Sequence, residues 1–181
     1  MRTGEALVCR FALALLVAAT VMGRAGHAAD APTTGVWQKH EYELQYAGFN
    51  SAYSCDWLEE KLRLLLKTSG ARADVQIKTR CIEPSGPSPG AAAQIVFFTL
   101  AAGGGATDTP AAWRKVSLRD HSPMALEALD CELVAQFRDQ LLPLFTTRTV
   151  VDRTRCRPGE SSSQDIQLAY EVLAPTIAAE R

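Results

Sequence analysis

Apolar and polar residues alternate in some segments of this chain and recur at helical spacing in others. Tyr42, Leu44 and Tyr46 alternate with polar residues, a period of two that predicts a half-buried strand. Residues 55–68 instead carry an apolar stripe with helical spacing, formed by Leu58, Leu62, Leu65 and Leu66. Alternation returns over 75–81, and a third strand is predicted over 94–101. The pattern therefore predicts strand, helix, strand and strand.

Local signals at both ends support the helix over 55–68. Ser54 precedes it as a predicted N-cap, and Gly70 follows it as a predicted stop. Glu59 and Arg63 are four residues apart, which favours an ion pair on one helix face.

The same order recurs further along the chain. Strands are predicted over 112–118, 147–156 and 166–173, around a helix that Asp130 caps and Pro143 closes. Its apolar stripe consists of Val134, Phe137 and Leu141.

Tryptophan and cysteine positions indicate that the two parts are copies of one unit. Cys55 follows Trp37 by 18 residues, and Cys131 follows Trp113 by 18. Each of these cysteines precedes another, by 26 residues to Cys81 and by 25 to Cys156. We therefore infer an internal duplication. The predicted organisation is a lead-in over 29–36, repeat 1 over 37–102, a Gly-rich linker over 103–112, repeat 2 over 113–175 and a tail over 176–181, with both repeats in one compact domain.

The duplication also predicts the disulfides. Of the five cysteines, Cys9 lies in the N-terminal segment that we expect to be removed, and the other four allow three pairings. In each copy one cysteine opens the helix and the other closes the next strand, so a helix that returns antiparallel to that strand brings them together. We expect Cys55–Cys81 and Cys131–Cys156; a rival pairing joins the two copies. The resulting fold class is α+β, with an internally duplicated β-α-β-β unit. It has about six mainly antiparallel strands and two helices on one face, ferredoxin-like in character.

The first 28 residues have the pattern of a signal peptide. Arg2 and Arg10 precede an apolar run over 11–22, which is shorter than the roughly 20 residues of a membrane span. Small residues follow, and we expect cleavage after Ala28, with Ala29 as the competing position. An uncleaved N-terminal anchor is the alternative. The predicted location is the periplasm or the exterior of the cell, with no membrane span after signal removal.

Composition narrows the functional classes. The chain has 181 residues, 47% of them hydrophobic, and a formal net charge of −1, which excludes a disordered protein and argues against a dedicated nucleic-acid binder. Four oxidised cysteines leave no metal-ligand set, and no cofactor motif is present, so we expect neither a metal nor a cofactor.

Candidate catalytic residues are few. Asp120 and His121 precede a serine, but adjacent residues cannot easily face one another as a catalytic relay requires. Asp152 occupies a position that the pattern predicts to face inward. We expect a bulge or an edge strand there, or a half-buried carboxylate beside an arginine.

Basic residues on two predicted strands suggest a binding surface. Lys78 and Arg80 lie on the outward face of one strand, and Arg153 and Arg155 lie on that of its counterpart. If these strands are close in space, the four residues form a basic stripe that suits an envelope protein or an anionic envelope component. An ordinary solvated strand face is the alternative.

The stretch YSCDWLEEKLRLLLKTSGAR, with the later CELV, resembles small exported proteobacterial proteins of uncharacterised function. This resemblance implies export and carries no activity with it. Our first hypothesis is a non-catalytic periplasmic binding or adaptor module. The alternatives are a hydrolase-like envelope enzyme that uses Asp120, His121 and Asp152, and a structural homodimer formed by strand pairing. The sequence does not settle the oligomeric state.

Overall fold

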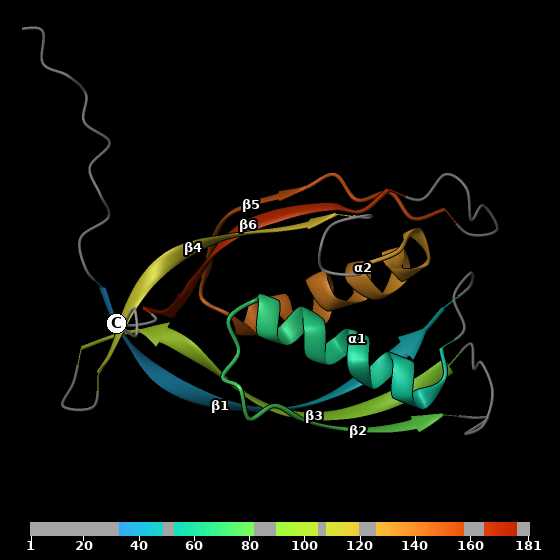
Figure 1. Ribbon diagram of the computed structural model, residues 1–181, viewed down its shortest axis with the longest axis horizontal. Helices are drawn as coiled ribbons and strands as arrows, with labels where there is room; N and C mark the ends of the chain where they lie inside the picture. Colours follow the sequence, from blue (N-terminus) through green and yellow to red (C-terminus); the bar gives the residue numbers. More distant parts are fainter. Residues whose placement is uncertain are drawn as a thin grey trace, which may run out of the picture.

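The computed structural model describes residues 33–48, 53–81, 90–104, 108–119, 126–157 and 165–176. Over these residues the chain forms one sheet of six antiparallel strands and two α-helices (Figure 1). The elements are β1 (Thr33–Ala47), α1 (Cys55–Thr68), β2 (Gln76–Cys81), β3 (Gly90–Ala102), β4 (Thr109–Arg119), α2 (Cys131–Gln140), β5 (Thr147–Asp152) and β6 (Gln167–Pro175). Single 3₁₀ turns over Ala128–Asp130 and Leu142–Leu144 flank α2.

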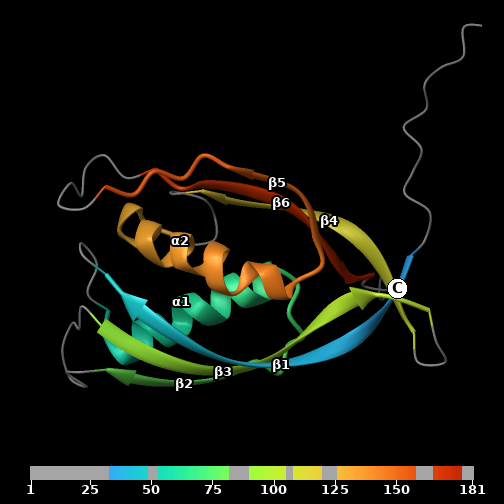
Figure 2. The same cartoon turned by 180° about the vertical axis from the view of Figure 1, so that it is seen from behind.

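The strand order is β2-β3-β1-β4-β6-β5, and the sheet has two three-stranded leaves. β1 pairs with β3 from Gly35 to Ala47 but with β4 only over residues 33–35. The leaves are therefore joined at one end and diverge toward the other. Figures 1 and 2 show both helices in the space between the leaves. The predicted α+β class, with antiparallel strands and two helices on one face, is confirmed.

Each leaf places its elements in the same way. The last strand of each β-α-β-β segment lies in the middle of its leaf, as β3 between β1 and β2 and as β6 between β4 and β5. This agreement is compatible with the inferred duplication, which stays a prediction. Three strands begin earlier than the sequence indicated. β3 starts at Gly90, four residues before its predicted start. β1 starts at Thr33 in the predicted lead-in and β4 at Thr109 in the predicted linker, where these two strands pair with each other.

Inward side chains of both leaves and the apolar stripes of both helices form the core. The α1 stripe of Leu58, Leu62, Leu65 and Leu66 is fully buried. Phe97 of β3 lies 5.7 Å from Phe145, ring centroid to ring centroid, so the core is continuous from one half of the chain to the other. Burial of each such side chain contributes about 1.5–3 kcal/mol.

The ends of α1 are as predicted. The Ser54 hydroxyl accepts a hydrogen bond from the Trp57 N–H at 3.3 Å, and Arg63 pairs with Glu59 at 2.6 Å. Gly70 follows the helix with φ of +93°, a conformation that glycine adopts without strain. The prediction for α2 is wrong in one respect. Asp130 precedes α2, but its side chain makes no capping bond to that helix because other partners engage it.

Both predicted disulfides are present. Cys55 bonds to Cys81 and Cys131 bonds to Cys156, with Cα–Cα distances of 5.9 and 5.6 Å. Each joins the first residue of a helix to the strand, or strand extension, that follows it. The predicted signal peptide lies outside the described residues. Within the described chain, neither helix has the length and apolarity needed to cross a bilayer.

Candidate functional site

The outer face of the second leaf carries a row of polar side chains on β4. Lys115, Ser117 and Arg119 are exposed there, because the residues between them point into the core. The register across to β6 places Ser117 opposite Ala169 and Arg119 opposite Gln167. The β4 row therefore lies directly beside the middle strand of the leaf.

A second basic row lies on the other side of β6, at the sheet edge. The Arg153 N–H donates to the Gln167 carbonyl at 2.8 Å, which continues the β5 ladder past its last strand residue. Arg155 follows, and its backbone pairs with that of Asp165. Both arginines are exposed.

A shallow groove of about 290 Å³ lies between these rows, and we call it the C-terminal groove. Its lining consists of Ser117, Arg119, Val151, Arg153, Gln167, Leu168 and Ala169. The floor is β6, where Ala169 adds little bulk. Neighbouring strands lie about 4.8 Å apart, so the β4 and β5 rows are separated by roughly 10 Å.

The cations of this groove are available to a ligand. Within the described part of the chain, Arg119 and Arg153 of the lining, and Lys115 of the neighbouring β4 row, have no acidic side chain within salt-bridge distance. Arg148, on the same leaf, is in contrast engaged, since its Nε donates to Glu171 Oε2 at 2.6 Å. Among the described residues, positive charge therefore collects at the groove without an acidic partner.

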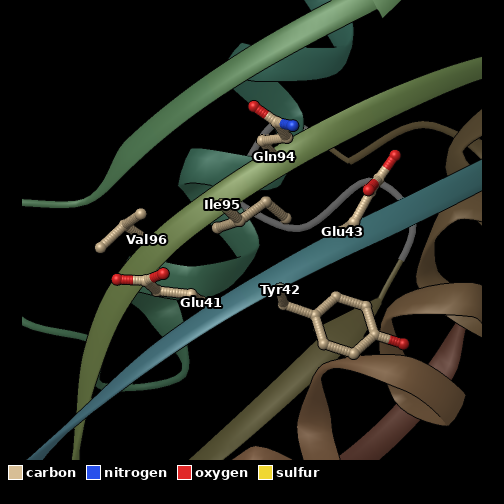
Figure 3. Close-up of a pocket in the computed structure, with 6 residues that line it drawn as sticks. All are labelled: Glu41, Tyr42, Glu43, Gln94, Ile95 and Val96. Carbon is tan, nitrogen blue, oxygen red and sulfur yellow. The ribbon is translucent and has the colours of Figure 1, made fainter.

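The first leaf has a corresponding groove of about 360 Å³, which we call the N-terminal groove (Figure 3). Figure 3 labels its lining, which is Glu41, Tyr42, Glu43, Gln94, Ile95 and Val96. Here the carboxylates have partners. Lys39 pairs with Glu41 at 2.5 Å, and Arg80 lies 3.6 Å from Glu43.

The two grooves differ in charge at corresponding positions. Counted from Trp37 and Trp113, Glu43 and Arg119 both lie six residues further along the chain. Glu41 corresponds in the same way to Ser117. Replacement of two carboxylates by a hydroxyl and a guanidinium makes the C-terminal groove a set of hydrogen-bond donors and cations, which suits an anion.

The structure separates the residues of the predicted basic stripe. Lys78 and Arg80 lie on β2 at one edge of the sheet, whereas Arg153 and Arg155 lie at the β5 edge. The four residues therefore do not lie side by side. Arg153 is instead grouped with Arg119, which the sequence reasoning missed. The alternation along 113–119 marks Arg119 as an outward-facing residue. Only the strand order shows that Arg153 lies across β6 from it.

Asp152 combines the three features expected for it, which are an edge strand, an irregular register and an arginine partner. It ends the edge strand β5, and the β5–β6 register shifts between Arg148 and Val151, where Thr149 has φ of +54°. The Asp152 carboxylate accepts hydrogen bonds from Arg138 and from the Thr154 N–H. Partial burial raises the pKa of Asp152, but these hydrogen bonds outweigh it and the net pKa lies below the usual value. Asp152 is thus an ionised, paired carboxylate.

The other two predicted catalytic candidates, Asp120 and His121, lie outside the described residues. His40 of β1 is described and contacts the second half of the chain through Thr99. The Thr99 hydroxyl donates to the Leu144 carbonyl at 3.0 Å and lies 2.8 Å from His40 Nε2. Because Thr99 uses its proton on Leu144, the His40 Nε2–H is the donor to Thr99.

The partial burial of His40 predicts a pH dependence of stability. Burial lowers the pKa of His40 below its ordinary value of 6.5, so the folded protein binds its proton less readily than the unfolded chain does. The free energy of unfolding is expected to be constant above about pH 6.5 and to fall as the pH drops below it. Urea unfolding between pH 5 and 8 measures this, with His40→Gln as the non-titrating control. An identical pH profile for both proteins contradicts the prediction.

A buried polar cluster joins the two helices, and the sequence reasoning missed it. Lys61 of α1 donates to Asp130 Oδ2 at 2.9 Å, and the Tyr53 hydroxyl donates to Asp130 Oδ1 at 2.5 Å. The Glu127 N–H donates to Oδ2 at 2.8 Å. Burial and the Asp130 charge raise the pKa of Tyr53 far above its usual range, so its phenol stays protonated. We interpret the cluster as a link between the two halves of the chain. The sequence feature that could have indicated it is Lys61, a lysine beside the apolar stripe of α1.

The described residues contain no group of three or more histidine, cysteine or acidic side chains arranged to hold a metal ion. Comparisons with models of protein families, with curated proteins and with solved structures give no match. The functional argument therefore depends on the geometry of this chain.

Proposed function

We propose that this protein is an exported, non-catalytic binding module that holds an anionic partner on the outer face of its second leaf. The observation that carries the proposal is the C-terminal groove. Arg119 and Arg153 line its two sides, and neither has an acidic partner among the described residues. Guanidinium groups bind carboxylates and phosphates through paired hydrogen bonds, so an unpaired set of this kind favours an anion.

Export is the second part of the proposal. Its support is the N-terminal pattern of the sequence together with the two disulfides, since disulfides form and persist in oxidising compartments. The periplasm and the cell exterior both satisfy these conditions.

A catalytic role has less support. Asp152, one of three candidate residues for a hydrolase, is paired with Arg138 and hydrogen-bonded to the Thr154 backbone. No described feature favours the homodimer over a monomer, and sedimentation of the oxidised protein measures that directly.

The proposal predicts a charge-reversal result. We expect the oxidised protein to bind at least one of three anionic probes: phosphatidylglycerol vesicles, inorganic polyphosphate and polyglutamate. The variant Arg119→Glu/Arg153→Glu is expected to lose about tenfold or more in affinity for that probe, because it replaces two cationic contacts by two repulsive ones. Isothermal titration calorimetry near 50 mM salt measures the loss, since screening is weak there.

The matched control is Lys78→Glu/Arg80→Glu. It changes the net charge by the same amount, but at the opposite edge of the sheet. All four side chains are exposed, so both variants should fold. Equal losses in the two variants, or no binding of any probe by the unmodified protein, overturns the proposed function.

A further inference from the structure

We infer that the occupant of the C-terminal groove is a short, extended protein segment with consecutive acidic residues, laid along β6. This inference depends on the proposed function, since it specifies the anion that the same site binds. Its evidence is the arrangement of charge around the groove and the closure of the neighbouring sheet edge.

The groove has a cationic row on each side. Arg119 lines the groove on the β4 side, with Lys115 further along that strand, and Arg153 lines it on the β5 side, with Arg155 just beyond it. In an extended chain, consecutive side chains point to opposite sides, and the rise is about 3.3 Å per residue. Consecutive acidic residues lying along β6 would therefore reach the two rows in turn, so that neighbouring carboxylates meet Arg119 on one side and Arg153 on the other, both beside Gln167.

Two carboxylates limit the length of such a segment. Glu171, which is paired with Arg148, lies at one end of the β6 floor, and Asp165 lies at the other, where it accepts a hydrogen bond from the Gln167 side chain at 2.5 Å. Between them the floor is electrically neutral over Gln167 and Ala169. A continuous anionic surface such as a bilayer would also lie against the Asp165 carboxylate. A short extended segment of about four residues fits between the two ends and places its acidic residues beside Arg119 and Arg153.

The segment is expected to bind over the face of the leaf and not by addition to its edge. Asp152 Oδ1 accepts the Thr154 N–H at 2.8 Å, so the free edge has one donor already occupied. The register shift of β5 and the positive φ of Thr149 further disrupt this edge. Both features protect a sheet edge from another strand.

Two peptides of identical composition test the inference. Each has four aspartates and four serines. In the contiguous peptide the four aspartates follow one another, and in the alternating peptide each aspartate is followed by a serine. The alternating peptide presents all its aspartates to one side when extended, so it can satisfy only one cationic row. We expect the contiguous peptide to bind the oxidised protein about fivefold more tightly or better. Its aspartates reach cations on both sides of the groove, whereas those of the alternating peptide reach cations on one side only. Fluorescence anisotropy with labelled peptides near 50 mM salt gives the two dissociation constants.

The variants separate this result from general charge attraction. Arg119→Glu/Arg153→Glu is expected to weaken the contiguous peptide by about tenfold or more, and Lys78→Glu/Arg80→Glu by no more than about twofold. Equal affinity for the two peptides overturns the inference. Binding of phosphatidylglycerol vesicles or polyphosphate that requires Arg119 and Arg153, without peptide binding, also overturns it but leaves the proposed function standing. Failure of every probe overturns both.

Discussion

Removal of both disulfides is expected to leave most of the protein unfolded at 37 °C. The two bonds close chain segments with sequence separations of 26 and 25 residues. In the chain-entropy model each contributes about 3.5 kcal/mol. Their sum of roughly 7 kcal/mol is comparable to the whole stability of a typical domain, which is about 5–15 kcal/mol. The four-site cysteine-to-alanine variant, followed by circular dichroism and urea unfolding, measures the loss.

Single removals provide the control for this prediction. Cys55→Ala/Cys81→Ala and Cys131→Ala/Cys156→Ala should each lower the free energy of unfolding by about 2–5 kcal/mol. The second pair should show the larger loss, because Cys131 is fully buried and its replacement leaves a small cavity. A four-site variant within about 1 kcal/mol of the unmodified protein would show that the core alone sustains the fold.

Lys61→Met is expected to destabilise the protein by about 3–5 kcal/mol, because it leaves the Asp130 carboxylate buried without its cation. Asp130 is 2% exposed and Lys61 is 7% exposed, so water can do little to solvate the Asp130 carboxylate once the lysine is gone. Tyr53 would still donate to Asp130, but a neutral donor compensates a buried charge only in part. The midpoint and slope of urea unfolding at pH 7 give the change in stability.

An exposed ion pair is the matched control. Lys39→Met removes a cation from Glu41 on the outer face of β1, and the loss there is expected to stay within about 1 kcal/mol. The double variant Lys61→Met/Asp130→Leu should recover part of the stability: it removes the burial penalty of both charges, but the Tyr53 hydroxyl and the Glu127 N–H lose their acceptor. Equal effects of Lys61→Met and Lys39→Met would contradict the role of the cluster as a link between the halves.

The charge difference between the two leaves is the basis of the functional proposal. Both leaves arrange their strands alike and both carry a shallow groove on the outer face. The carboxylates of the N-terminal groove are neutralised by Lys39 and Arg80, whereas Arg119 and Arg153 have no such partners in the described chain. A common framework with one unneutralised surface is the pattern expected when binding is assigned to one leaf.

Local residue patterns predicted the elements well. The helix over 55–68 was placed at its observed bounds, with its N-cap, its ion pair and its glycine stop. Alternation located several of the strands, although β1, β3 and β4 begin earlier than predicted. The first residues of β1 and β4 pair with each other across the leaves, and such pairing leaves no periodic signal along the chain.

The candidate site was predicted only in part. Arg153 and Arg155 were identified from their outward positions, but they were grouped with Lys78 and Arg80. Neighbouring positions in a sheet depend on the strand order, and β2 and β5 occupy its opposite edges. Asp130 was predicted as a helix cap, but its carboxylate binds Lys61, which is 69 residues away in the chain.

The sequence by itself determined the class of fold, the two helices, the disulfide pairing and the alternation that separates inner from outer side chains. These properties depend on interactions within a few residues or on a spacing that occurs twice. The tertiary structure decided which basic residues share a surface, which carboxylates are neutralised and how Lys61 reaches Asp130. Those outcomes depend on strand order and on the packing of the helices between the leaves, both of which are set by contacts between residues far apart in the chain.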